Sequence, residues 1–103
     1  MVQLVQRKRI EVMADAPLCE WLAETAARVG IAHYSVATLS AGSGQSGHWR
    51  DEDVSGAVAK RLFIAIASAE KADAFLEGLA PHLDEYGLLV TLGDVDVVRG
   101  ERF

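Results

Sequence analysis

The residues best suited to ligand chemistry lie in one glycine-rich segment, residues 40–56, which contains Gly42, Gly44, Gly47 and Gly56. Glycine adopts positive φ angles readily and lets backbone N–H groups approach a ligand with no side chain between them. Successive N–H groups arranged in this way form a concave anion-binding site. A long segment without regular structure is uncommon in a small domain and often has a binding function. The sequence therefore predicts a loose, anion-binding loop here.

Other chemistries find less support in the residue types. The glycine-rich run lacks the Gly-Lys-Ser/Thr ending of a P-loop, and Ser43 and Ser46 have no neighbouring His and Asp to make either a nucleophile. No Cys or carboxylate stands at metal-ligand spacing from the three histidines, which are His33, His48 and His82. We therefore expect no catalytic residue and no metal site. Trp49 fits two roles, closing over a ligand or partner, or packing within its own subunit.

Composition indicates one small acidic domain. The chain has 103 residues, half of them apolar, and a formal net charge of −5, so one core is feasible and no global field attracts nucleic acid. The basic run Arg7-Lys8-Arg9 is interpreted as a solvated strand end. Cys19 is the only cysteine, which excludes an intrachain disulfide and fits a small buried residue of a helix. No apolar run has the length of a signal peptide or a transmembrane segment, and we expect a cytoplasmic protein.

Apolar periodicity predicts four strands and two helices. The strands are expected at residues 9–13, 33–39, 61–67 and 88–98, the last one bent near Gly93-Asp94. Asp15 is expected to cap the first helix, which has Pro17 in its first turn and an apolar stripe before Gly30, made of Leu18, Trp21, Leu22, Ala26 and Val29. Ser68 is expected to cap the second, which Pro81 interrupts and Gly87 ends, with a stripe of Ala72, Phe75, Leu76, Leu79, Leu83 and Tyr86.

This order of elements, strand-helix-strand-strand-helix-strand, is that of the ferredoxin-like α+β fold, in which two helices cover one face of a four-stranded antiparallel sheet. The continuous apolar run at residues 61–67 favours a central strand that is apolar on both faces. The helix-free face is thus expected to meet other subunits in a closed ring.

Two segments resemble the PII signalling proteins, and more closely the PII-like branch that includes the carboxysome-associated PII proteins. Residues 29–48 (VGIAHYSVATLSAGSGQSGH) resemble the family's passage from the first helix through the second strand into the T-loop, with Gln45, Gly47 and His48 matching a Gln-x-Gly-His ending. Residues 94–103 (DVDVVRGERF) resemble its last strand and short Arg-Gly-Glu ending. The resemblance covers nearly the whole chain. It implies one PII-like domain, residues 1–103, with a T-loop at about 40–58.

The resemblance further implies a homotrimer that binds adenine nucleotides between subunits and reports their occupancy to a partner protein through the T-loop. Carried over by position, Ser35, Val36 and Ala37 would line the adenine and ribose. The nucleotide would be wrapped at the T-loop base by Gly42, Ser43, Gly44 and Gln45. The backbone of Gly87 and Leu88 would turn under the phosphates, and their cation would be Arg99 or Arg102.

Some members of the carboxysome-associated group bind bicarbonate beside the nucleotide, and this chain has groups suited to a small planar anion. The candidate amides are those of Gly44 and Gly47, and the candidate cations are Arg50, Lys60 and Arg61. A solvated charged patch formed with residues 51–53 is the alternative role for Arg50.

The chain also departs from the pattern of the PII proteins proper. Both tyrosines, Tyr34 and Tyr86, lie outside the T-loop, so uridylylation of a T-loop tyrosine is not expected. The turn at residues 85–88 lacks the family's lysine. Losing such a charge-assisted contact costs about 1.5–3 kcal/mol, which favours ADP or AMP over ATP.

The favoured hypothesis is a nucleotide-gated signalling trimer whose target is a bicarbonate transporter, a carboxysome component or another protein. Two alternatives share the fold. One is a small ferredoxin-like enzyme, for which the sequence offers no evident acid–base pair or nucleophile. The other is a trimer related to metal tolerance, for which the histidine placement is poor.

Overall fold

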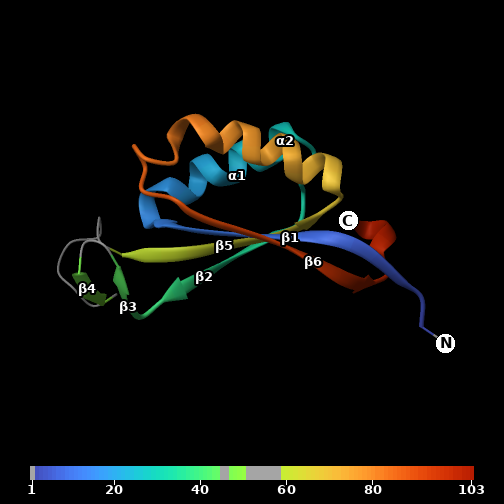
Figure 1. The fold of residues 1–103 in the computed structure, drawn as a ribbon, viewed down its shortest axis with the longest axis horizontal. Coiled ribbons are helices and arrows are strands. Elements are labelled where there is room, and N and C mark those ends of the chain that lie inside the picture. The colour runs from blue at the N-terminus through green and yellow to red at the C-terminus, as the bar shows by residue number, and fades with distance from the viewer. Residues whose placement is uncertain (1, 45–46, 51–58) are drawn as a thin grey trace.

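The computed structural model describes residues 2–44, 47–50 and 59–103, and Figure 1 shows two helices packed over a twisted sheet. Within these residues the main sheet is antiparallel and has the strand order β2-β5-β1-β6. Its strands are β1 (Leu4–Asp15), β2 (Tyr34–Leu39), β5 (Lys60–Ala67) and β6 (Leu89–Val98), and the helices are α1 (Cys19–Arg28) and α2 (Ala69–Leu79). The ferredoxin-like α+β expectation is confirmed.

The core lies between the two helices and the face of the sheet that they cover. Ile10 of β1, Phe63 of β5 and Phe75 of α2 are fully buried there. Burial alternates along β5, where every second residue from Phe63 to Ala67 is buried and the intervening Ile64 and Ile66 on the opposite face are only partly covered. This strand lies between β2 and β1, in the central position that its apolar run predicted.

The first strand is longer than expected. It begins at Leu4 rather than at residue 9, because it pairs with β6 along ten positions, from Leu4 opposite Val98 to Met13 opposite Leu89. The basic run Arg7-Lys8-Arg9 therefore lies inside a strand, and its interpretation as a solvated strand end is wrong. The same pairing runs without a break through Gly93-Asp94, where the sequence suggests a bend.

The two expected helix caps have different outcomes. Asp15 makes no side-chain cap, because its carboxylate accepts a hydrogen bond from Lys60 Nζ at 2.5 Å; a 3-10 turn that contains Pro17 (η1, Ala16–Leu18) follows it. The cap at Ser68 is confirmed, since its Oγ accepts from the backbone N–H of Lys71 at 3.3 Å. Pro81 lies in the 3-10 turn after α2 (η3, Ala80–His82), as the expected interruption requires.

The glycine-rich segment is not structureless where the structure describes it. Ala41–Gly44 (β3) and Gly47–Arg50 (β4) pair as an antiparallel hairpin, which lies at the end of the molecule away from the C-terminus (Figure 1). The expectation of a loose loop is wrong for these residues, because the small side chains of β3 leave room for close pairing and the ring of Trp49 in β4 covers Gly42. Gln45, Gly56 and the rest of 45–46 and 51–58 lie outside the described residues.

In the described part of the chain, no helix combines the length and apolar character needed to cross a membrane.

Candidate functional site

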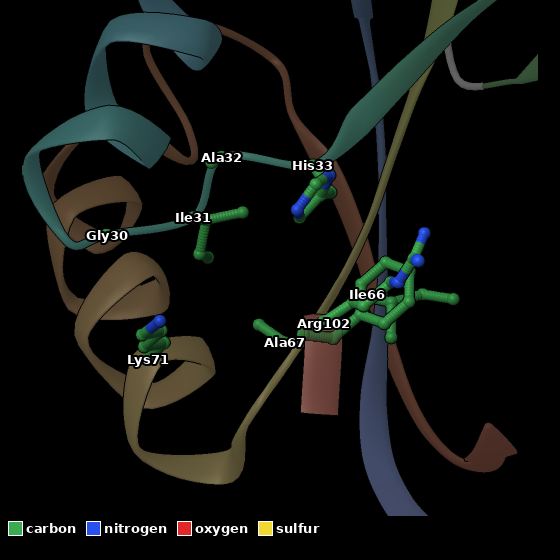
Figure 2. Close-up of a pocket in the computed structure, with 9 residues that line it drawn as sticks. Gly30, Ile31, Ala32, His33, Ile66, Ala67, Lys71 and Arg102 are labelled. Atoms are coloured by element: carbon green, nitrogen blue, oxygen red, sulfur yellow. The ribbon is translucent and has the colours of Figure 1, made fainter. Parts of the chain in front are cut away.

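A cavity of about 140 Å³ lies at the end of the sheet where the C-terminus returns to the fold. Figure 2 shows it between the connection from α1 to β2, the first turns of α2 and the C-terminal turn. Four separate stretches of chain supply its lining, which consists of Gly30, Ile31, Ala32, His33, Ile66, Ala67, Lys71, Arg102 and Phe103.

The wall formed by the α1–β2 connection is fixed by the way α1 ends. Gly30 has φ +85°, its N–H donates to the carbonyl of Ala27 at 3.1 Å, and the N–H of Ile31 donates to the carbonyl of Ala26 at 2.9 Å. These two bonds and the left-handed glycine make a Schellman cap. Ile31 is buried in the core, with 3 % of its surface exposed. This anchor holds the next two residues, Ala32 and His33, at the cavity.

The opposite wall comes from the C-terminus. The backbone reverses at Arg99, which has φ 63° and ψ 43°, and continues into one 3-10 turn, Gly100–Arg102 (η4). The ring of Phe103 then meets the ring of His33 at a centroid distance of 5.3 Å and an interplanar angle of 60°. Arg102 lies across the cavity from the connection between α1 and β2 (Figure 2), and Phe103 belongs to the same lining.

The chemistry of this lining suits an anion that carries a flat apolar group. Lys71 and Arg102 supply fixed positive charge, and Arg102 can bind phosphate oxygens through two parallel N–H groups. Ile66 and the ring of Phe103 supply apolar surface beside those charges. Across the described residues there is no group of three or more His, Cys, Asp or Glu side chains that could hold a metal ion.

The residues predicted to contact nucleotide fall into three places. Ser35, Val36 and Ala37 lie on β2, an edge strand of the sheet, and Gly42, Ser43 and Gly44 follow in β3. Gly87, with φ +60°, and Leu88 precede β6 on the opposite edge, three strand spacings or roughly 14 Å away. Arg99 and Arg102 follow β6, whose ten residues span about 30 Å.

One chain therefore does not bring the predicted nucleotide residues together. Of them, only Arg102 lines the 140 Å³ cavity. Arg99 lines a different one, of about 300 Å³, with Val2, Gln3, Val5, Val98, Gly100 and Glu101. The roles assigned to these residues stay predictions.

The residues predicted for bicarbonate lie around the hairpin and the start of β5. Gly44 and Gly47 pair with each other at the tip of the described hairpin, and Arg50 lies opposite Ala41 at its base. A cavity of about 360 Å³ is lined there by Ala41, Gly42, His48, Trp49 and Arg50. Lys60 is bound to Asp15, and Arg61 donates through Nη1 to the carbonyl of Lys60 at 3.0 Å.

Two further residues have clear structural outcomes. Trp49 packs on Gly42 of its own chain, so the structure shows the second of its two expected roles. Cys19 is only partly buried, contrary to the expectation of a buried residue. Burial raises the pKa of its thiol, and the charge of Arg61 opposes that shift.

Of the nine residues that line the cavity, sequence reasoning assigned only Arg102 to a ligand site, and the charged and aromatic side chains that it missed are His33, Lys71 and Phe103. Gly30 as a helix stop was a usable signal, because it places the residues that follow it. Nothing in the periodicity marks Lys71, since its relevance depends on the C-terminus returning to the start of α2.

Comparisons with known proteins agree on one family. The sequence model of the family described as nitrogen regulatory protein P-II matches residues 7–102. The chain is similar to CPII, a nitrogen regulatory PII-like protein of Thiomonas intermedia solved with ADP, AMP and bicarbonate, with a TM-score of 0.90 and 22% identity over 100% of this chain and 98% of that one. It is also similar to a PII-like signaling protein of Thermus thermophilus, with a TM-score of 0.85 and 25% identity over 98% of each chain.

A more distant likeness is to the GlnK–ATP complex of B. subtilis, with a TM-score of 0.61 and 12% identity over 87% of this chain and 82% of that one. At such low identities a structural likeness establishes a shared fold. The comparison with curated proteins found no match.

Proposed function

The chain belongs to the nitrogen regulatory protein P-II family, and from this membership we propose that it is a PII-like homotrimer that binds ADP or AMP between its subunits. The family is one of signalling proteins, and we accordingly propose regulation rather than catalysis. The similar CPII of Thiomonas intermedia was solved with ADP, AMP and bicarbonate, which supports the same ligand class for this chain.

The observation that carries this proposal is the separation of the predicted site residues to the two ends of the sheet. Gly42 to Gly44 lie in the hairpin beyond the far end of β2, whereas Arg102 lines the cavity at the C-terminal end, beside His33 at the start of β2. A second copy of the chain can place its own hairpin end against that cavity. Pockets that enclose a small-molecule ligand measure about 300–1,000 Å³. At about 140 Å³ the cavity of one chain is smaller than that, which supports a site completed by a second subunit.

The helix-free face of the sheet supports the trimer. Met13, Leu62, Ile64 and Ile66 project from the strands on this face and are only partly covered within one chain. Burying apolar surface of this kind contributes about 25 cal/mol per Å², which favours association of several copies around these faces. A closed ring satisfies all of them at once.

The charges near the proposed phosphate position favour a short phosphate chain. Lys71 and Arg102 are the cations of the cavity, and the turn at Gly87 and Leu88 offers backbone groups without a lysine. A third phosphate would lack the charge-assisted contact that a lysine there supplies, worth about 1.5–3 kcal/mol. We propose ADP or AMP over ATP for this reason.

The hairpin is the proposed reporter of the bound state. Ligand that contacts Gly42 to Gly44 stabilises one arrangement of β3 and β4 and so shifts the population seen by a target protein. Bicarbonate is the proposed second ligand, with Arg50 and the amides of Gly44 and Gly47 as its contacts. We propose inorganic-carbon or energy status as the signal, with a bicarbonate transporter or a carboxysome component as the target.

Isothermal titration calorimetry with AMP, ADP, ATP and bicarbonate, singly and together, tests the ligands, and light scattering after size-exclusion chromatography tests the trimer. Arg102→Ala should weaken ADP binding by about 10- to 100-fold. The exposed Arg28 at the end of α1 gives a matched control, and Arg28→Ala should leave the affinity unchanged. A monomer in solution, or a trimer that binds none of the three nucleotides, would overturn the proposal.

A further inference from the structure

We propose that Arg7 is a positioning residue for the cavity, because its guanidinium holds the C-terminal turn that carries Arg102 and Phe103. The inference rests on the proposed nucleotide function of that cavity. It adds a residue of β1 that is not part of the cavity lining and acts through the backbone of Gly100.

The C-terminal turn has few bonds of its own. The N–H of Arg102 donates to the carbonyl of Arg99 at 3.2 Å, and the N–H of Phe103 donates to the carbonyl of Gly100 at 3.0 Å. The turn begins at Arg99, whose left-handed backbone is unfavourable for a residue other than glycine. A single 3-10 turn with this start is not stable alone, so its position depends on contacts with the rest of the fold.

Arg7 makes such a contact across 93 residues of sequence. Its Nη2 donates to the carbonyl of Gly100 at 3.0 Å, in a partly buried setting, and its Nη1 donates to the carbonyl of Gln6 at 2.9 Å. Its Nε is buried and has no partner among the described residues. The guanidinium is therefore partly buried between β1 and the turn, with Nη1 at the exposed side. A hydrogen bond from a charged donor is stronger than one from a neutral donor.

Gly100 sits directly on β1 beside this contact. A Cβ atom at position 100 would come within 2.5 Å of Val5 Cβ, and Gly100 is buried. Val5 and Arg7 are two residues apart on β1, so their side chains project from the same face of the strand. Val5 packs against Gly100, and Arg7 donates to the carbonyl of Gly100. The turn is thus held in place by two residues of β1, Val5 and Arg7.

The contacts of Gly100 with Val5 and Arg7 fix the position of the next residues, Arg102 and Phe103. With Gly100 held, Arg102 and Phe103 follow within one turn and line the cavity opposite His33. A cation that is already in place loses less conformational freedom when it binds phosphate, and this preorganisation strengthens binding. Loss of the Arg7 bond frees the turn without removing any lining group.

The test is a double-mutant cycle measured by titration calorimetry with ADP. Arg7→Ala should weaken ADP binding by about tenfold, and Arg7→Lys, which can still reach the carbonyl, should recover part of that loss. In an Arg102→Ala background the same Arg7→Ala change should have a clearly smaller effect, because only the contribution through Phe103 is left for the turn to position. Lys8→Ala is the matched control, since Lys8 is the neighbouring cation on β1 and its Nζ pairs with Asp94 of β6.

Unchanged ADP affinity in Arg7→Ala, or equal losses in both backgrounds, would overturn the role of Arg7 while leaving the nucleotide function intact. Amide hydrogen exchange at Arg102 and Phe103 gives a readout that needs no ligand. Both amides should exchange at least tenfold faster in Arg7→Ala than in the parent protein and Lys8→Ala. If the parent protein binds no ADP, the proposed function fails, and the exchange rates still decide whether Arg7 holds the turn.

Discussion

The indole ring of Trp49 lies over Gly42, its cross-strand partner in the hairpin, so closely that a Cβ atom at position 42 would come within 2.3 Å of Trp49 Cζ2. The absence of a side chain at Gly42 is therefore what leaves room for the Trp49 ring on the opposite strand. Gly44, two residues further along β3, has no atom within 4 Å of its corresponding position.

Gly42→Ala should displace the Trp49 ring, whereas Gly44→Ala should leave it in place. In a Trp21→Phe background, where Trp49 is the only tryptophan, Gly42→Ala should shift the fluorescence emission to longer wavelength because the ring becomes more exposed to water. The free energy of unfolding should change by less than about 0.5 kcal/mol, because the hairpin lies outside the core. Identical emission spectra for the two variants would contradict the packing of Trp49 on Gly42.

Arg99 combines a left-handed backbone with a predicted role as the phosphate cation, and two substitutions separate these properties. Arg99→Gly should raise the free energy of unfolding by about 0.5–1 kcal/mol relative to Arg99→Ala, since only glycine adopts φ 63° without strain. Urea denaturation measures this difference. Both variants remove the cation, so an equal loss of ADP affinity in the two would support a phosphate contact for Arg99, and unchanged affinity in both would contradict it.

The order of the two helices and the four strands of the main sheet could be predicted from the sequence because each depends on local periodicity, whereas the β3–β4 hairpin was not predicted. The stripe from Leu18 to Val29 and the apolar run of β5 identify α1 and a central strand without knowledge of the fold. The Ser68 cap is equally local. Asp15 has the right residue type for a cap as well, but its carboxylate binds Lys60, which is 45 residues away in the sequence.

The candidate site could be predicted only in part, because its cavity depends on long-range contacts. Arg102 was included through the resemblance to a family. Lys71 and His33 become neighbours of Arg102 only when the chain reverses at Arg99 and Gly100 settles on Val5. No pattern within a window of 10 or 20 residues contains that information.

Gly100 is expected to tolerate no side chain. Gly100→Ala places a methyl group against the stiff, β-branched Val5 and should destabilise the fold by about 1–3 kcal/mol through overpacking. Thermal unfolding measures this loss. Val5→Ala in the same chain should restore most of the stability by making room for the methyl group, and a double variant no more stable than Gly100→Ala alone would show that the two residues do not compete for that space.

Cys19 should react slowly with iodoacetamide in the folded protein, because burial raises the pKa of its thiol and the nearby Arg61 only partly offsets this. Since the folded pKa lies above the unfolded one, the thiol contributes stability that is fully present below the unfolded pKa and is lost as pH rises through the folded pKa. As the pH is increased, the alkylation rate of the folded protein should therefore begin to rise at a higher pH than the rate of the denatured chain. Coincident pH profiles for the two states would contradict the shift.

Ser68 and Asp15 test what a cap contributes at the two helix starts. Ser68→Ala removes the acceptor for the Lys71 N–H and should lower the free energy of unfolding by about 1 kcal/mol, whereas Ser68→Asp keeps an acceptor and should stay within about 0.5 kcal/mol of the parent protein. Asp15→Ala removes a partly exposed ion pair with Lys60, worth about 0–1 kcal/mol, and no cap. Because Lys71 lines the cavity from the first turn of α2, Ser68→Ala should also weaken ADP binding, and Asp15→Ala should not. Urea denaturation and calorimetry of the three variants measure both effects, and a larger loss of stability in Asp15→Ala than in Ser68→Ala would refute this assignment of the caps.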